Sequence, residues 1–217
     1  MKKSGRYDTS GLIETQYEPG SNKQALKNLL GIKSKQEINK IEAKELLRVT
    51  KEMTEYYDDN HCFTAADICY MHHSWLGSIY EWPGRYRNVT MMKDNFPFAA
   101  PAFIPKLMDE FEKEILCQYT PCNFISRYDV VRALAVVHTE LLLIHPFREG
   151  NGRIGRLLAI IMALQAQLPF LDFSDLKDQK KDEYFVAVRT GMEHDYKPME
   201  KIFNDVIYRS LKYYDEG

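Results

Sequence analysis

The stretch HPFREGNGRIGR, residues 145–156, places one histidine, one acid, three glycines and three arginines in twelve consecutive positions. Packing of a hydrophobic core gives no reason for this mixture of residue types. The apolar run before it predicts a buried helix that ends near His145, because Pro146 cannot continue a helix. A second apolar helix is expected to start near Asn151 and to stop before Pro169. The stretch therefore lies where two core helices meet.

This position gives the glycine-rich segment a chemical meaning. Gly150, Asn151 and Gly152 fall at a helix N-terminus, where unpaired N–H groups and the helix dipole favour an anion. The glycines let the backbone approach a ligand without a Cβ in the way. Arg153 and Arg156 share roughly one helical face and add cationic donors. The pattern predicts a polyphosphate ligand.

An acid and a base complete the candidate site. Glu149 lies among positive groups, and a carboxylate that faces phosphates requires a divalent cation between them, for which Mg²⁺ is the expected choice. His145, with an ordinary pKa of roughly 6.5, is the expected general base. Each residue alone is explained by a helix cap, a solvated acid or a surface arginine. Their joint occurrence favours nucleotidyl or phosphoryl transfer to a hydroxyl group.

The same letters fit a rival motif. Gly150, Gly152 and Gly155 match the dinucleotide-binding fingerprint, and Asp172 follows at a suitable distance. That fingerprint requires a preceding strand within a βαβ unit, whereas the segment before it is long and helical. A Walker phosphate loop is excluded because GxxxxGK[ST] does not occur. We reject both nucleotide-binding alternatives.

The rest of the chain is predicted to be mainly α-helical. Apolar periodicity predicts helices over 34–57, 63–80, 102–119 and 126–145, and two more from about Asp182 and about Pro198. Capping signatures support three of the starts, at Ser34 with Glu37, at Thr64, and at Ser126 with Asp129. One β-hairpin is expected, with a β-prone run over 86–92, a turn at Asp94 and Asn95, and residues 96–98 beyond it.

Composition and net charge limit the classes of protein to which the chain can belong. The chain has 217 residues, is 45% hydrophobic and 28% charged, and carries a formal net charge of −2. This balance predicts one sizeable globular domain and argues against binding to nucleic acid or to membrane surfaces. No signal peptide or membrane span is expected. The four cysteines follow no metal-ligand spacing, and we interpret them as reduced thiols of a cytoplasmic protein.

The motif resembles the signature of Fic-domain proteins, HPFx[D/E]GNGRxxR, at every fixed position. YEPGSNKQALKNLLGI resembles the arm ahead of many bacterial Fic cores, and YEWPGRYRNVTMMKDNFPFA resembles their flap. The resemblance runs from about residue 17 into the C-terminal helices and indicates the bacterial single-domain type. It implies a Fic-type helical bundle with a small β-hairpin flap over the active site. We expect a loose arm over 1–20 and a Fic domain over 21–217, with its core at about 34–210 and its flap at about 84–98.

The family's usual activity is transfer of AMP from ATP to a Ser, Thr or Tyr hydroxyl of a protein, with release of pyrophosphate. By this resemblance, His145 deprotonates the hydroxyl and Glu149 holds Mg²⁺ against the α- and β-phosphates. Residues 150–152 cradle the phosphates, while Arg153 and Arg156 hold the β/γ side.

Further site residues follow from the resemblance, each with a simpler interpretation beside it. Met91 and Met92 of the flap would contact a target segment that adds as a strand, or else they pack the hairpin. Tyr184 and Phe185 would line the adenine pocket, or else they are core residues. The acceptor is a protein, and self-modification on one of fourteen tyrosines stays open, as does a homo-oligomer.

Three alternative activities keep the same motif. A lysine in place of the second glycine is associated with relatives that transfer phosphate, so the intact Gly152 favours AMP transfer over a phosphotransferase. The reverse reaction, removal of AMP from protein, is not separated by sequence. A non-catalytic nucleotide-binding module is disfavoured because binding alone requires neither His145 nor Glu149.

Many Fic proteins carry a self-inhibiting helix, [S/T]xxxE[G/N], and the chain has no full match to it. Glu216 followed by Gly217 ends the chain, but Lys212 stands where the hydroxyl residue belongs. The open interpretations are a degenerate inhibitory role for Glu216 near Arg156, a separate antitoxin-like partner, or an unrestrained enzyme.

Overall fold

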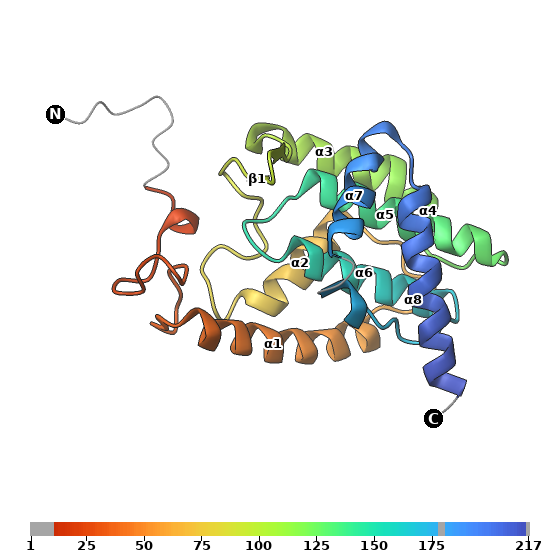
Figure 1. The fold of residues 1–217 in the computed structure, drawn as a ribbon, viewed down its shortest axis with the longest axis horizontal. Coiled ribbons are helices and arrows are strands. Elements are labelled where there is room, and N and C mark those ends of the chain that lie inside the picture. The colour runs from red at the N-terminus through yellow and green to blue at the C-terminus, as the bar shows by residue number, and fades with distance from the viewer. Residues whose placement is uncertain (1–10, 178–180, 216–217) are drawn as a thin grey trace.

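The computed structural model of the chain describes residues 11–177 and 181–215 (Figure 1). Its α-helices are α1 (Lys35–Tyr56), α2 (Ala65–Leu76), α3 (Ile104–Glu110), α4 (Cys117–Tyr119), α5 (Arg127–Ile144), α6 (Asn151–Gln165), α7 (Lys181–Thr190) and α8 (Lys197–Asp215). Short 3₁₀ turns are η1 (Ile13–Thr15), η2 (Pro101–Phe103), η4 (Ser174–Lys177) and η5 (Gly191–Glu193), and η3 (Phe111–Leu116) is a π-helical stretch that joins α3 to α4. Strands β1 (Met92–Lys93) and β2 (Phe96–Pro97) pair antiparallel. The predicted mainly α class with one small hairpin is confirmed.

Helix starts follow local capping chemistry at two of the three predicted places. The hydroxyl of Ser34 accepts a hydrogen bond from the backbone of Glu37, and Thr64 forms a full capping box with Asp67. Ser126 makes no side-chain cap bond, so the predicted capping interaction there is wrong, although α5 does begin at the next residue. This end of α5 is exposed, and water can satisfy its amides.

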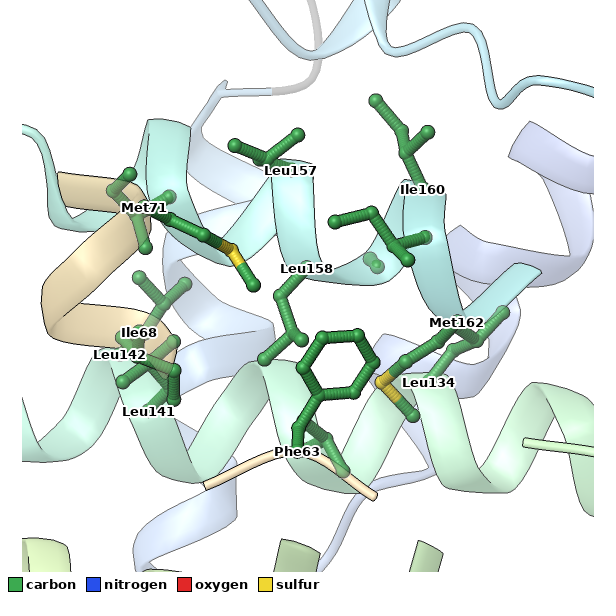
Figure 2. Close-up of a cluster of buried hydrophobic side chains, with 14 of the residues drawn as sticks. Phe63, Ile68, Met71, Leu134, Leu141, Leu142, Leu157, Leu158, Ile160 and Met162 are labelled. Atoms are coloured by element: carbon green, nitrogen blue, oxygen red, sulfur yellow. The ribbon is translucent and has the colours of Figure 1, made fainter. Parts of the chain in front are cut away.

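Helices α5 and α6 pack against each other at the centre of the molecule. Helices α1 and α2 contact α6, while α7, α8 and η3 contact α5. Figure 2 shows apolar side chains filling the space between these layers; those labelled are Phe63, Ile68, Met71, Leu134, Leu141, Leu142, Leu157, Leu158, Ile160 and Met162. Burial of each such side chain stabilises the fold by roughly 1.5–3 kcal/mol before the entropy of ordering is counted. Close packing on all sides fixes where α5 ends and α6 begins.

The hairpin is shorter than predicted. Residues 86–91 form no strand, and the strand expected over 86–92 is wrong except for its last residue. The physical reason is that backbone groups here bond elsewhere: the Arg87 N–H donates to the Pro146 carbonyl, and the Asn88 N–H donates to the Glu14 carboxylate. The turn is confirmed, since Asp94 and Asn95 both have positive φ, 49° and 62°, as a two-residue hairpin turn requires.

The described part of the N-terminal region rests on the rest of the fold. An isolated bridge joins Tyr17 to Leu26, and Glu14 is only 6% exposed. The division into an arm over 1–20 and a domain over 21–217 stays a prediction. Within the described residues, no helix combines the length and the apolar character needed to cross a bilayer. The cysteines there are all free thiols.

Candidate active site

A cavity of about 440 Å³ opens at the start of α6, a size typical of sites for small ligands. Its walls come from the flap, the end of α5, the loop 145–150, the first turns of α6, and α7. The lining residues are Met91, Met92, Lys93, Phe98, Leu142, His145, Arg148, Glu149, Gly150, Asn151, Gly152, Arg153, Arg156, Leu176, Lys181, Tyr184, Phe185 and Val188. The structure thus places every predicted site residue around one cavity, apart from Glu216, which lies outside the described residues.

His145 caps α5 in a left-handed conformation, with φ 53° and ψ 58°. Its Nδ1 lies 3.2 Å from the Leu142 carbonyl, which can only accept, so we assign the proton to Nδ1 and the lone pair to Nε2. The Phe98 ring stacks on the imidazole at 3.7 Å between centroids. Burial, with smaller contributions from the Arg87 and Lys93 cations, lowers the pKa of His145 to about 4. The imidazole is therefore neutral at pH 7, with a basic nitrogen in the cavity wall.

Asn151 shapes the loop that follows the histidine. Its side-chain oxygen accepts from the Phe147 N–H at 2.9 Å, and its amide nitrogen donates to the Phe147 carbonyl at 2.8 Å. Because both ends of the buried amide are used, this side chain holds the turn closed on itself. The part of Asn151 that remains for a ligand is its backbone.

The first amides of α6 lie where the glycines predict an anion site. Gly150 is the N-cap residue with φ 88°, and its N–H donates to the Glu149 carboxylate. The N–H groups of Asn151 and Gly152 bond to no residue within 11–177 and 181–215. Two backbone donors at a helix N-terminus therefore face the cavity side of the loop, where an anion gains from both donors and dipole.

The two motif arginines take different partners. Arg153 donates to Glu42 at 2.7 Å and to Glu149 at 3.1 Å, and its guanidinium lies 4.5 Å from the centre of the Trp75 ring. Arg156 instead lies near the Tyr184 hydroxyl of α7, and its positive charge opposes the rise in the pKa of that tyrosine. Both line the cavity, but Arg153 already has two carboxylate partners. Arg156 is the arginine with the greater freedom to bind a phosphate.

Glu149 is the one carboxylate that lines the cavity within the described residues. Both of its hydrogen bonds, from Gly150 and from Arg153, reach the same oxygen, Oε1. No group of three or more ligating His, Cys, Asp or Glu side chains occurs among the residues described. A single carboxylate oxygen beside the predicted phosphate site nonetheless fits Mg²⁺, which often takes one carboxylate and completes its shell with phosphate oxygens and water.

Tyr184 and Phe185 occupy the α7 wall. The Tyr184 hydroxyl lies 2.7 Å from Nε2 of His138, a fully buried histidine, and burial raises the pKa of Tyr184 to about 12. Phe185 lies beneath the ammonium of Lys93, which is 3.1 Å from the ring centre. The ring of Tyr184 packs in the core while its hydroxyl pairs with His138. An adenine contact by either residue stays a prediction.

The flap forms the opposite wall. Met91 and Met92 line the cavity, and Met92 is 65% exposed, so its side chain is open to a partner. Arg189 of α7 donates to the carbonyls of Lys93 and Asp94 at the flap turn, at 3.4 and 3.2 Å. The flap is therefore tied to α7 at its tip. A target contact by the two methionines stays a prediction.

Several residues of this site were not predicted from the sequence. Glu42 is 1% exposed and falls on the apolar face of α1, four residues after Ile38, and an acid at such a position is a detectable signal. Phe98, Lys93 and Arg148 line the cavity without a comparable signal, because their roles depend on how the flap and loop pack. Arg87, also 1% exposed, looked like an ordinary residue of a β-prone run.

Comparison with known proteins points to one family. Residues 62–163 match the model of the Fic/DOC family. The chain is 31% identical over 137 residues to protein adenylyltransferase VbhT of Bartonella schoenbuchensis, covering 58% of the chain and 26% of that protein. It is 27% identical over 153 residues to protein adenylyltransferase Fic of Drosophila erecta, covering 70% of the chain and 29% of that protein. The chain thus spans less than a third of the length of these curated relatives.

The fold also matches a solved structure. The BepC protein of Bartonella tribocorum, a VirB-translocated effector whose crystal structure holds bound AMPPNP, superposes with a TM-score of 0.70 at 22% identity, covering 90% of the chain and 97% of that structure. At this identity the similarity shows the fold, and the helical bundle with its small flap is of that type.

Proposed function

Because this chain is a Fic-family protein, we propose that it is a protein adenylyltransferase, which transfers AMP from ATP to a Ser, Thr or Tyr hydroxyl and releases pyrophosphate. The observation that carries the proposal is the arrangement at one cavity: the free Nε2 of His145 on one side and the unpaired amides of Asn151 and Gly152 on the other. Curated relatives named as protein adenylyltransferases, and the AMPPNP bound to BepC, support ATP as the co-substrate.

The chemistry assigned to His145 follows from its tautomer. The hydroxyl oxygen attacks the α-phosphorus, the bond from that phosphorus to the bridging oxygen breaks, and pyrophosphate leaves. Nε2 takes the hydroxyl proton, while Nδ1–H stays bonded to the Leu142 carbonyl and keeps the ring oriented. A triphosphate beside the imidazole raises its pKa, because negative charge favours the protonated ring.

The α6 start and its neighbours bind and orient the nucleotide. The amides of Asn151 and Gly152 bind phosphate oxygens, and Arg156, which lies near Tyr184, binds the β/γ side. Glu149 would hold Mg²⁺, which when bound neutralises phosphate charge. Arg153 bonds Glu149 and so orients this carboxylate, a narrower role than the phosphate contact expected from the sequence.

Incubation with ATP labelled either at the α- or at the γ-phosphate tests the proposal, with the chain itself and a bacterial lysate as acceptors. Label retained on protein from the α-position alone is expected, and His145→Ala should abolish it while the circular dichroism spectrum stays unchanged. Retention from the γ-position alone would instead identify a phosphotransferase. Tight ATP binding without retention would support a binding module, and release of AMP from a pre-modified protein would support the reverse reaction.

An inhibitory role of Glu216 and an antitoxin-like partner remain predictions of the sequence. The same labelling experiment bears on them, because self-modification by the chain alone would indicate an unrestrained enzyme.

A further inference from the structure

Arg87 is a buried cation of the flap segment, and its side chain lies between the flap strands and the loop 145–150. Its guanidinium donates to the carbonyl of His145 at 2.7 Å and, more weakly, to that of Ile144 at 3.5 Å. On its other side it donates to the carbonyls of Val89 at 2.5 Å and Ala99 at 2.7 Å. One planar side chain thus joins four carbonyls from two segments that are distant in the sequence.

One segment belongs to the flap, which is proposed to bind the target, and the other carries the proposed base. Val89 and Ala99 flank the flap strands β1 and β2, and residues 144–146 include the proposed base. The backbone of Arg87 adds a further bond, from its N–H to the Pro146 carbonyl at 2.8 Å. A burial this complete is costly for a cation unless its donors are satisfied. All three guanidinium nitrogens are, and the Glu14 carboxylate nearby partly balances the charge.

Hydrogen bonds through His72 give a second connection between residues 84–87 and the loop 145–150. The Gly84 N–H donates to Nδ1 of His72 at 2.9 Å, and Nε2 of His72 lies 3.0 Å from the Glu149 carbonyl. Burial lowers the pKa of His72 to about 3, so the ring stays neutral and can accept on one nitrogen while it donates from the other. Residues 84–87 therefore hold both ends of the loop 145–149.

The hydrogen bonds of Arg87 also affect the surroundings of the His145 imidazole. Phe98, whose ring stacks on His145 at 3.7 Å, directly precedes Ala99, whose carbonyl Arg87 holds. The same guanidinium therefore fixes the backbone under the base and the backbone under the ring that covers it. Resting on the proposed function, we infer that Arg87 is a positioning residue that couples the placement of the flap to the placement of His145. A target docked on the flap is thereby brought into register with the base.

Hydrogen exchange of the nucleotide-free chain tests the coupling without reference to activity. In Arg87→Met, we expect the amides of peptides covering 88–99 and 145–150 both to exchange at least about tenfold faster, because charge-assisted hydrogen bonds to each segment are lost. Arg87→Lys keeps the charge but cannot reach both sets of carbonyls, so it should restore protection in part. The matched control is Arg85→Met, two residues away on an exposed side chain, which should change neither peptide.

Two results would overturn the inference. In one, only the flap or only the loop exchanges faster, so that the residue supports a single segment. In the other, peptides from α8 accelerate equally in both Arg87 variants, which would show a general loss of stability. Because exchange requires neither nucleotide nor target, these outcomes are independent of whether the chain transfers AMP.

Kinetics with α-labelled ATP give a second measurement where transfer is observed. Arg87→Lys should lower kcat by at least about tenfold while the KM for ATP stays within about twofold, since the phosphates bind at α6 and not at Arg87. Arg85→Met should match the parent chain in both constants. A rise in KM with an unchanged kcat would contradict a role in placing the base.

Discussion

Gly150 and Gly152 lie two positions apart, and glycine is required at each for a different physical reason. Gly150 has φ 88°, and a Cβ there would approach the Trp75 ring to 2.5 Å. A Cβ at Gly152 would meet only Nη1 of Arg156, at 3.6 Å, and would otherwise enter the open cavity. The first glycine is required by the fold and the second by the ligand.

Alanine at each position should separate these needs. Gly150→Ala is expected to lower the free energy of unfolding by about 3 kcal/mol, through the left-handed backbone and the contact with Trp75. Gly152→Ala should leave the melting temperature unchanged or higher, because alanine favours a helix. Its affinity for ATP should fall at least about tenfold, because the methyl group occupies the space beside the first amides. Thermal melts and calorimetric titration measure both, and unweakened ATP binding by Gly152→Ala would count against the phosphate site.

Glu42 and Arg153 form the most buried ion pair that contributes to the site. Glu42 also accepts from the Tyr80 hydroxyl at 2.7 Å, so both carboxylate oxygens are used. We expect Glu42→Gln to destabilise the fold by about 2 kcal/mol, less than for a fully buried pair because Arg153 is partly exposed. Arg153→Met should cost less when added to Glu42→Gln than alone, with a coupling of about 1–2 kcal/mol in urea unfolding. Strict additivity would show that the pair contributes no specific energy.

The motif residues could be predicted because their spacing alone brings them to one helix start. The partner of Arg153 could not, because Glu42 reaches it only through the packing of α1 on α6. The role of the Asn151 side chain also could not be predicted from the sequence. Whether its amide faces a ligand or its own loop depends on how tightly residues 147–151 turn.

At the scale of elements, the ends of α5 and α6 were predictable and the flap was only partly so. Apolar periodicity and Pro146 fix where α5 stops, and the glycines mark where α6 begins. The flap strands are two residues each because the N–H groups of Arg87 and Asn88 bond to the Pro146 carbonyl and to Glu14 instead of to a strand. A period-2 pattern cannot distinguish these bonding partners.

Arg189 should stabilise the backbone at the tip of the flap without affecting the backbone that carries His145. Loss of its bonds to the Lys93 and Asp94 carbonyls in Arg189→Met is expected to speed exchange in 91–98 several-fold and to leave 145–150 unchanged, since the loop keeps its bonds to Arg87. Hydrogen exchange measures both segments. Arg127→Met, an exposed change at the start of α5, is the control. Faster exchange in the loop would mean that the tip and the base are not independently held.

At the scale of the whole molecule, two buried histidines, His72 and His138, and the half-buried His145 make stability depend on pH. Burial lowers the pKa of His72 to about 3 and the pKa values of His138 and His145 to about 4. In the unfolded chain each would titrate near 6.5. The unfolded state therefore binds more protons between these limits, and stability that is fully present above about pH 6.5 is lost as the pH falls toward 4.

The free energy of unfolding should accordingly fall by about 1.4 kcal/mol per pH unit for each of the three histidines between pH 6 and pH 5. Urea unfolding across this range measures the slope. His145→Ala should reduce the slope by about a third, since one titrating group is removed. A flat profile above pH 5 would show that these imidazoles are not held neutral by burial.

The central claim is that the nucleotide binds with its α-phosphorus facing His145. A crystal structure of the wild-type chain with Mg²⁺ and α,β-methylene ATP tests it most directly. We expect the triphosphate on the amides of Asn151 and Gly152, with the α-phosphorus separated from Nε2 of His145 by the space of a single oxygen. A nucleotide bound in reverse, with its γ-phosphorus nearest the imidazole, or bound away from the start of α6, would contradict the account.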